Sequence, residues 1–132
     1  MTDLVGKLAL IIEDDATSIA VLQQLLENVG VEAEVITDNF RISDHLQQAQ
    51  RPDVIFLDLE MPQANGYTVL EYIQQNSKFD GLPIVAYTTH ISHLNDAKKA
   101  GFHSFLGKPL DGKLFREQLT RILNDIPVWE VP

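Results

Sequence analysis

The sequence contains no cysteine among its 132 residues, which excludes both a disulfide framework and a thiolate metal site. Basic residues are also scarce, because ten Lys and Arg stand against nineteen Asp and Glu and leave a formal net charge of −9. Phosphate backbones need a basic protein face, so this balance argues against direct nucleic-acid binding by the domain. An acidic domain suits contact with metal ions, cationic groups or basic surfaces instead.

Two further absences concern location. The start of the chain, Met1-Thr2-Asp3, lacks the basic and apolar regions of a signal peptide. No apolar run approaches the length that spans a membrane. We therefore expect a cytoplasmic protein without a membrane association.

The chain has the length and the hydrophobic content, 45%, of one globular domain, and it contains no repeat and no Gly/Ser-rich linker. We predict a single domain over residues 1–125 and a short C-terminal tail over residues 126–132. The tail holds the only tryptophan, Trp129, and two prolines, which favour an extended conformation. Two interpretations of the tail stay open: it folds back on the domain, or it begins a linker.

Apolar runs of strand length alternate with stretches of helical periodicity. The runs expected to form strands cover residues 8–12, 34–36, 54–57, 84–87 and 104–106. The intervening helices are expected around residues 19–29, 42–49, 69–73 and 94–100, with Ser92 as N-cap of the fourth and a fifth beginning near Asp111. Five strands alternating with five helices predict an α/β fold with a parallel sheet covered on both faces. The pattern leaves the strand order open.

Ligands of open parallel sheets bind at the carboxyl ends of the strands. Polar residues follow the predicted strands there: Glu13-Asp14-Asp15 after the first, Asp58 after the third, Thr88-Thr89 after the fourth and Lys108-Pro109 after the fifth. If the strands are parallel, all of these groups gather at one edge of the sheet.

Each of these residues also has an ordinary explanation. Asp15 is a suitable helix cap, and Asp58 could order the loop that follows it. Their convergence favours a different interpretation, because several carboxylates at one edge repel one another unless a cation such as Mg²⁺ lies among them. A lysine and a hydroxyl at the same edge complete a site for a phosphoryl group, and a carboxylate can act as nucleophile toward phosphorus. The residues thus predict that Asp58 is phosphorylated.

This pattern resembles the receiver domain of bacterial two-component response regulators, over nearly the whole chain from Lys7 to about Asp125. The family's motifs stand in order: the acidic pair Glu13-Asp14, the phosphoacceptor segment LDLEMPQANG with Asp58, Met61-Pro62 and Gly66, the hydroxyl residue Thr88, and the pair Lys108-Pro109.

The resemblance implies a flavodoxin-like, doubly wound five-stranded parallel sheet in the order 2-1-3-4-5 with five helices, the order that receivers exemplify. It implies a Mg²⁺ ion, with Mn²⁺ as a substitute, held by Asp14, Asp58 and the main-chain carbonyl of Glu60, with Glu13 acting through water. It also implies roles for four further residues. Lys108 bridges to the acyl phosphate, the Thr88 hydroxyl moves to bond a phosphoryl oxygen, Phe105 is the aromatic switch residue that turns inward, and Pro109 follows a cis bond.

Three positions depart from the usual family pattern. Thr89 stands where the family usually has a smaller residue, so we expect narrowed access and slower exchange with small phosphodonors. Glu60 adds a carboxylate two residues beyond the acceptor, where we expect it to alter the lifetime of the phosphoryl group. Phe105 lacks a tyrosine hydroxyl, so any switch at this position depends on packing alone.

The resemblance implies a signalling domain that takes its phosphoryl group from a sensor histidine kinase or a histidine phosphotransfer protein. It would signal through the face formed by the fourth helix, the fifth strand and the fifth helix, which could also support a homodimer. No output domain is expected in this chain, and no activity beyond its own phosphorylation and dephosphorylation.

Three alternatives carry less weight. A degenerate receiver would act as a phosphorylation-independent binding module, but Asp14, Asp58, Thr88 and Lys108 are all present. An aspartate-nucleophile phosphatase usually carries its nucleophile after the first strand, and here the candidate ends the third. A flavodoxin is disfavoured because residues 13–15 would repel the phosphate of a flavin.

Three histidines, His90, His93 and His103, suggest a metal site at first sight. The spacing of His90 and His93 could place both on one helical face, but the expected cap at Ser92 puts His90 before the helix, and the pair lacks a third ligand. We interpret these histidines as solvated or loop residues.

Overall fold

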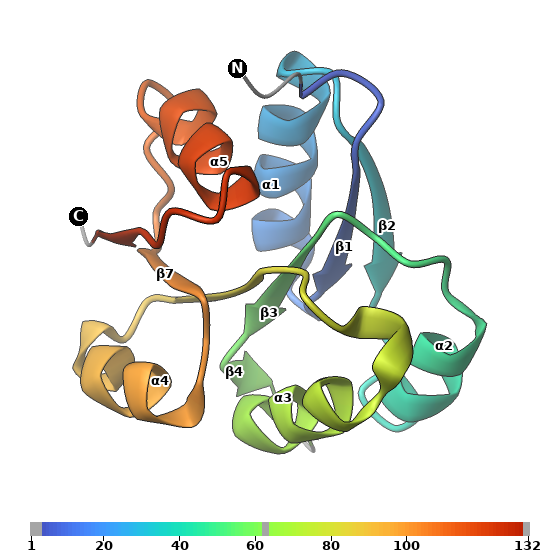
Figure 1. The fold of residues 1–132 in the computed structure, drawn as a ribbon. Coiled ribbons are helices and arrows are strands. Elements are labelled where there is room, and N and C mark those ends of the chain that lie inside the picture. Colours follow the sequence, from blue (N-terminus) through green and yellow to red (C-terminus); the bar gives the residue numbers. More distant parts are fainter. Residues whose placement is uncertain (1–3, 62–63, 131–132) are drawn as a thin grey trace.

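The computed structural model describes residues 4–61 and 64–130, and Figure 1 shows their arrangement. A parallel sheet of six strands forms the centre, in the order β2-β1-β3-β6-β7-β8. Its strands are β1 (Leu8–Ile12), β2 (Glu32–Ile36), β3 (Val54–Asp58), β6 (Ile84–Thr88), β7 (Ser104–Gly107) and β8 (Trp129–Glu130). The five α-helices are α1 (Ala16–Asn28), α2 (Ile42–Gln48), α3 (Gly66–Gln75), α4 (Leu94–Ala100) and α5 (Phe115–Leu123).

Shorter elements connect these. The strands β4 (Glu60–Met61) and β5 (Ala64–Asn65) form a separate antiparallel pair just after β3. The 3₁₀ helices η1 (Ser77–Phe79) and η2 (Ile91–His93) follow α3 and precede α4. None of the helices in the described ranges is both long and apolar enough to cross a membrane.

The predicted α/β class, the five helices and the order 2-1-3-4-5 of the first five sheet strands are confirmed. The expected number of strands is wrong, because the sheet has a sixth. The tail folds back and its residues Trp129–Glu130 pair in parallel with β7, Trp129 opposite Phe105. The last two residues of the predicted tail lie outside the described part of the chain.

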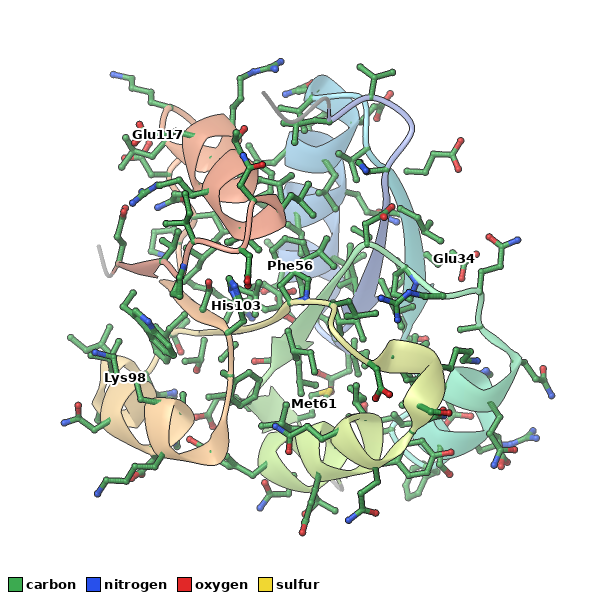
Figure 2. All side chains as sticks on the ribbon, viewed as in Figure 1. Glu34, Phe56, Met61, Lys98, His103 and Glu117 are labelled. Atoms are coloured by element: carbon green, nitrogen blue, oxygen red, sulfur yellow. The ribbon has the colours of Figure 1, made fainter. Side chains whose placement is uncertain are left out.

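The core consists of two layers, one on each face of the sheet. Alternate residues of β1 show the division: Leu10 and Ile12 join the layer under α2, α3 and α4, whereas Ala9 and Ile11 join the layer under α1 and α5. Phe56, labelled at the centre of Figure 2, belongs to the second layer. Burial on both faces explains why the strands read as continuous apolar runs rather than alternating ones.

Two expected helix starts are wrong. The carboxylate of Asp111 accepts a hydrogen bond from the backbone N–H of Lys113 at 2.9 Å, which stabilises a turn, and α5 begins only at Phe115. Ser92 lies inside η2, and the N-cap of α4 is His93. In both places the residue that a simple capping pattern assigns to the start of a helix lies in a local turn before that helix instead.

Candidate functional site

The carboxyl ends of β1, β3, β6 and β7 meet at one edge of the sheet. Glu13 follows β1 directly, Asp58 and Thr88 end β3 and β6, and Lys108 follows β7. All four are largely buried: Glu13 and Thr88 are 0% exposed, Asp58 is 3% exposed and the Lys108 side chain is 13% exposed. The parallel sheet therefore brings together acidic, hydroxyl and cationic groups that lie up to 95 residues apart in the chain.

The ammonium group of Lys108 is the centre of this cluster. Its Nζ lies 2.6 Å from Glu13 Oε1 and 3.7 Å from Asp58 Oδ1. It also donates to Ser18 Oγ at 3.1 Å and lies 4.4 Å from the centroid of the Tyr87 ring. Lys108 thus binds Glu13 directly and is poised beside Asp58 at a longer distance.

Two carboxylates and one lysine leave this buried cluster with an excess negative charge. Burial, followed by the neighbouring Glu13, raises the pKa of Asp58 to about 7, against the lowering effect of Lys108 and of the hydrogen bond that Asp58 Oδ1 accepts from the Glu60 N–H at 3.1 Å. Burial also acts to raise the pKa of Glu13, but hydrogen bonds with Asp58, Lys108 and Tyr87 outweigh it and lower that pKa. The proton shared by the pair therefore resides on Asp58.

The same carboxylates suit a divalent cation. Glu13, Asp14 and Asp58 each offer a carboxylate oxygen, and these oxygens lie within 4.8 Å of one another. Asp14 is exposed, and its Oδ2 accepts a hydrogen bond from Asn39 Nδ2 at 3.2 Å. Hard oxygen ligands, with room for water on the exposed Asp14 side, match the preference of Mg²⁺. A bound cation would also relieve the repulsion that otherwise keeps a proton on Asp58.

Glycine is required where α3 approaches the end of β3. A Cβ atom on Gly66 would lie 2.8 Å from Leu59 Cδ2, 3.0 Å from Leu59 Cα and 3.1 Å from the Asp58 carbonyl oxygen. These contacts are too short for any larger side chain without backbone movement. Gly66 therefore allows the N-terminus of α3 to pack directly behind Asp58.

The residues expected to act as a switch lie in and beside the sheet. Thr88 Oγ1 accepts a hydrogen bond from the His90 N–H at 3.2 Å, and the Lys108 N–H donates to the Thr88 carbonyl at 2.8 Å. Phe105 is completely buried in the layer under α3 and α4. The Lys108–Pro109 bond is cis, as the resemblance implies.

The sequence interpretation missed the partner of two histidines. Glu60 Oε1 lies 3.1 Å from His90 Nδ1 and 2.8 Å from His93 Nε2, so one carboxylate oxygen joins both imidazoles. The Tyr67 hydroxyl lies 3.2 Å from His93 Nδ1. The only signal was an acid two residues beyond Asp58 and two histidines after β6. This network lies on the loops that border the acidic edge.

Thr89 and His103 do not belong to the group of carboxylates formed by Glu13, Asp14 and Asp58. Thr89 is exposed and lines a pocket of about 260 Å³ that Ser18 and Lys108 also line. His103 lies just before β7, where its Nε2 is 3.0 Å from Asp125 Oδ1 and its Nδ1 is 2.8 Å from Ser104 Oγ.

The fold and the site define a class of protein: a doubly wound α/β domain with a buried cluster of acids and a lysine at the carboxyl edge of its sheet. The model of the response regulator receiver domain family matches residues 9–120, and the chain belongs to this family. It is a receiver domain of the kind found in response regulators and sensor kinases.

Relatives of known sequence show both long and short architectures. The chain is 27% identical over 120 residues to the sensor histidine kinase CheAY of Helicobacter pylori, and 33% identical over 109 residues to stress response regulator protein 1 of Candida dubliniensis. The match to CheAY covers 89% of this chain but only 14% of CheAY. The match to stress response regulator protein 1 covers 80% of this chain and 38% of that protein. It is 24% identical to the polar-differentiation response regulator DivK of Brucella anthropi, covering 90% of this chain and 98% of DivK.

Solved structures share the fold. The signal receiver domain of the DNA-binding response regulator merR from Colwellia psychrerythraea is 25% identical, with a TM-score of 0.77 over 90% of this chain and 99% of that one. The receiver domain of the sensor histidine kinase PA1611 from Pseudomonas aeruginosa is 23% identical, with a TM-score of 0.79 over 91% and 99%; that structure has a magnesium ion coordinated in its active site cleft.

The variant Asp58→Asn tests the protonation of the buried pair. The pKa of Asp58 is about 7 in the folded protein, against a usual 3.8, so the carboxyl binds its proton more tightly when folded. Its stabilising contribution is complete below pH 3.8 and is lost as the pH rises through about 7. Asparagine has no such loss, so we expect the variant to be more stable than wild type by roughly 1–3 kcal/mol at pH 8 without divalent cations.

Urea unfolding at pH 4, 6 and 8 measures this difference in the free energy of unfolding, which should shrink toward pH 4. The exposed substitution Asp80→Asn is the control and should follow wild type at every pH. An Asp58→Asn variant that is less stable than wild type at pH 8 would contradict the proposed protonation.

Proposed function

We propose that this receiver domain accepts a phosphoryl group on Asp58, from a phosphohistidine of a sensor kinase or a phosphotransfer protein, in a Mg²⁺-dependent reaction. The observation that carries the proposal is the position of Asp58. It is a buried carboxylate at the end of a central strand, beside Lys108 and within a set of carboxylate oxygens suited to a divalent cation.

The residues suited to hold the cation are Asp14, Asp58 and the main-chain carbonyl of Glu60, with Glu13 acting through water. Mn²⁺, which accepts similar oxygen ligands, is expected to substitute. When bound, the cation supplies positive charge that stabilises the phosphoryl oxygens. Glu13 and Asp14 would then fix this cation next to the acceptor.

Asp58 acts as the nucleophile in its ionised form. One of its oxygens bonds to phosphorus while the phosphorus–nitrogen bond of the donor phosphohistidine breaks, and the departing imidazole takes a proton from solvent. Lys108 exchanges its contact with Glu13 for one with a phosphoryl oxygen, which requires only a short movement because Asp58 Oδ1 is already 3.7 Å from Nζ. Both partners of this new contact are charged, which makes it strong.

Thr88 and Phe105 would convert this charge change into a change of shape. The Thr88 hydroxyl now accepts a hydrogen bond from His90, and it would turn to donate to a phosphoryl oxygen. Phe105, on the adjacent strand, would repack in response by packing alone. New contacts made only in the phosphorylated arrangement shift the population toward it.

The surface that would report this change is formed by α4, β7 and α5, which is our proposed contact for a downstream protein or a second copy of the chain. We expect no catalysis on external substrates. The strand β8 covers the outer edge of β7 within this surface.

Intact mass after incubation with Mg²⁺ and phosphoramidate or acetyl phosphate tests the proposal, with beryllium fluoride as the probe if the adduct is short-lived. We expect one adduct that requires Mg²⁺, is absent from Asp58→Asn and is retained in Asp80→Asn. No adduct with either probe in the folded wild type would refute phosphorylation and favour a degenerate receiver that binds partners without it.

Thr89 is expected to restrict small donors, because its exposed side chain lines the pocket that leads to Lys108. Thr89→Ala should therefore increase the initial rate of labelling by acetyl phosphate severalfold, measured by mass as a function of time. Thr17→Ala, on α1 in the same pocket, should leave the rate unchanged. Equal rates for wild type and Thr89→Ala would show that Thr89 does not limit access.

Glu60 is expected to shorten the life of the phosphoryl group, because a carboxylate beside the acceptor can accept a proton from an attacking water. Its contacts with His90 and His93 fix its position beside the acceptor. Glu60→Ala should therefore lengthen the phosphoryl half-life by about threefold to tenfold. The control is Glu71→Ala, an exposed acid on α3, and an unchanged half-life in Glu60→Ala would contradict this role.

A further inference from the structure

The C-terminal strand β8 is attached to the edge of β7 by backbone contacts. The Phe105 N–H donates to the Val128 carbonyl at 2.7 Å, and the Val128 N–H donates to Ser104 Oγ at 3.0 Å. Val128 is only 1% exposed and belongs to the core layer under α1 and α5. Val128 is therefore part of the packed domain.

Side chains from both flanking helices hold the two residues of β8. Lys98 of α4 places its Nζ 5.1 Å from the centroid of the Trp129 ring, in the region where Figure 2 labels Lys98. From α5, Gln118 Nε2 donates to Glu130 Oε2 at 2.9 Å, and Arg121 forms an ion pair with Glu130. Residues 128–130, which we call the strap, thus lie along the outer edge of β7 and are held by α4 on one face of the sheet and by α5 on the other.

Specific contacts also stabilise the turn that leads into the strap. Asp125 adopts a left-handed backbone conformation, with φ of 64°, that is uncommon for residues other than glycine. The contact between its carboxylate and His103 stabilises the turn, and the Ile126 N–H donates to the Arg121 carbonyl at 2.8 Å. His103 also contacts Ser104, which binds Val128. A connected set of contacts therefore ties the turn, the strap and β7 together.

β7 connects the strap to the phosphoacceptor site. Trp129 pairs with Phe105, and both pack in the layer under α3 and α4. Two residues beyond Phe105 the strand ends at Gly107, and the next residue is Lys108, which must change partners when Asp58 is phosphorylated. With β6 on one side and β8 on the other, β7 is held in one position, and with it the start of the Lys108 side chain.

We propose that residues 128–130 are a regulatory strap whose docking on β7 is energetically coupled to phosphorylation of Asp58. Phe105 is completely buried beside the docked strap, which is the inward position expected of the switch residue when Asp58 is phosphorylated, so docking favours the phosphorylated state. By linkage, phosphorylation favours docking to the same extent. The inference rests on the proposed function, and it makes Trp129 and Glu130, rather than the bare edge of β7, the surface that a partner meets between α4 and α5.

The test compares wild type with Glu130→Lys, which places a cation beside Arg121 and should release the strap. Glu71→Lys makes the same charge change at an exposed position of α3 and is the control. We expect the apparent affinity for beryllium fluoride with Mg²⁺ to fall about fivefold or more in Glu130→Lys, the lower range of allosteric coupling, and to stay unchanged in Glu71→Lys.

Trp129 provides an independent measurement because it is the only tryptophan in the chain. Acrylamide quenching of its fluorescence in wild type should decrease when beryllium fluoride and Mg²⁺ saturate the site, and this result decides the question even if Glu130→Lys does not fold.

Equal beryllium fluoride affinity in all three proteins, with unchanged quenching, would overturn the strap while leaving phosphorylation of Asp58 in place. Failure of wild type to bind the probe at all would instead overturn the proposed function, and the inference with it.

Discussion

The contact of Lys108 with two buried carboxylates is the interaction on which the rest of the structure depends. Glu13 and Asp58 are almost fully shielded from solvent, and a single lysine cannot neutralise both. A buried excess charge is costly, so the cluster must recruit a proton or a cation. The raised pKa of Asp58 and the convergence of Glu13, Asp14 and Asp58 are two expressions of this one imbalance. In the proposed function, a phosphoryl group with Mg²⁺ would resolve this imbalance in another way and would at the same time change the partner of Lys108.

The fold could be predicted because its signals are local and repeated. Each buried strand reads as an apolar run, and each strand at the active edge is followed by a polar residue such as Asp58 or Lys108. The order of the first five strands came from the family resemblance, since the alternation of strands and helices alone is compatible with several orders. The site residues were recognisable for the same reason: a parallel sheet places the ends of its strands at one edge, whatever their separation in sequence.

The features that escaped prediction depend on tertiary contacts. A strand of two residues, β8, has no periodic signal, and it forms because Ser104, Lys98 and Arg121 lie where the tail returns. The contacts of Glu60 with His90 and His93 depend on the conformation of two loops that are distant in sequence. A turn stabilised by Asp111 likewise delays the start of α5 beyond the residue that a cap would suggest. Sequence patterns describe elements well and the contacts between loops poorly.

The most direct test of this account is the titration of the Asp58 carboxyl carbon by ¹³C NMR, with Asp58→Asn used to assign the signal. The account predicts a midpoint near pH 7 without divalent cations, as the pKa of about 7 requires, and an ionised Asp58 throughout this range once Mg²⁺ is added. A midpoint near the usual value of 3.8, unaffected by Mg²⁺, would contradict the claim that a buried charge imbalance at Asp58 governs the site.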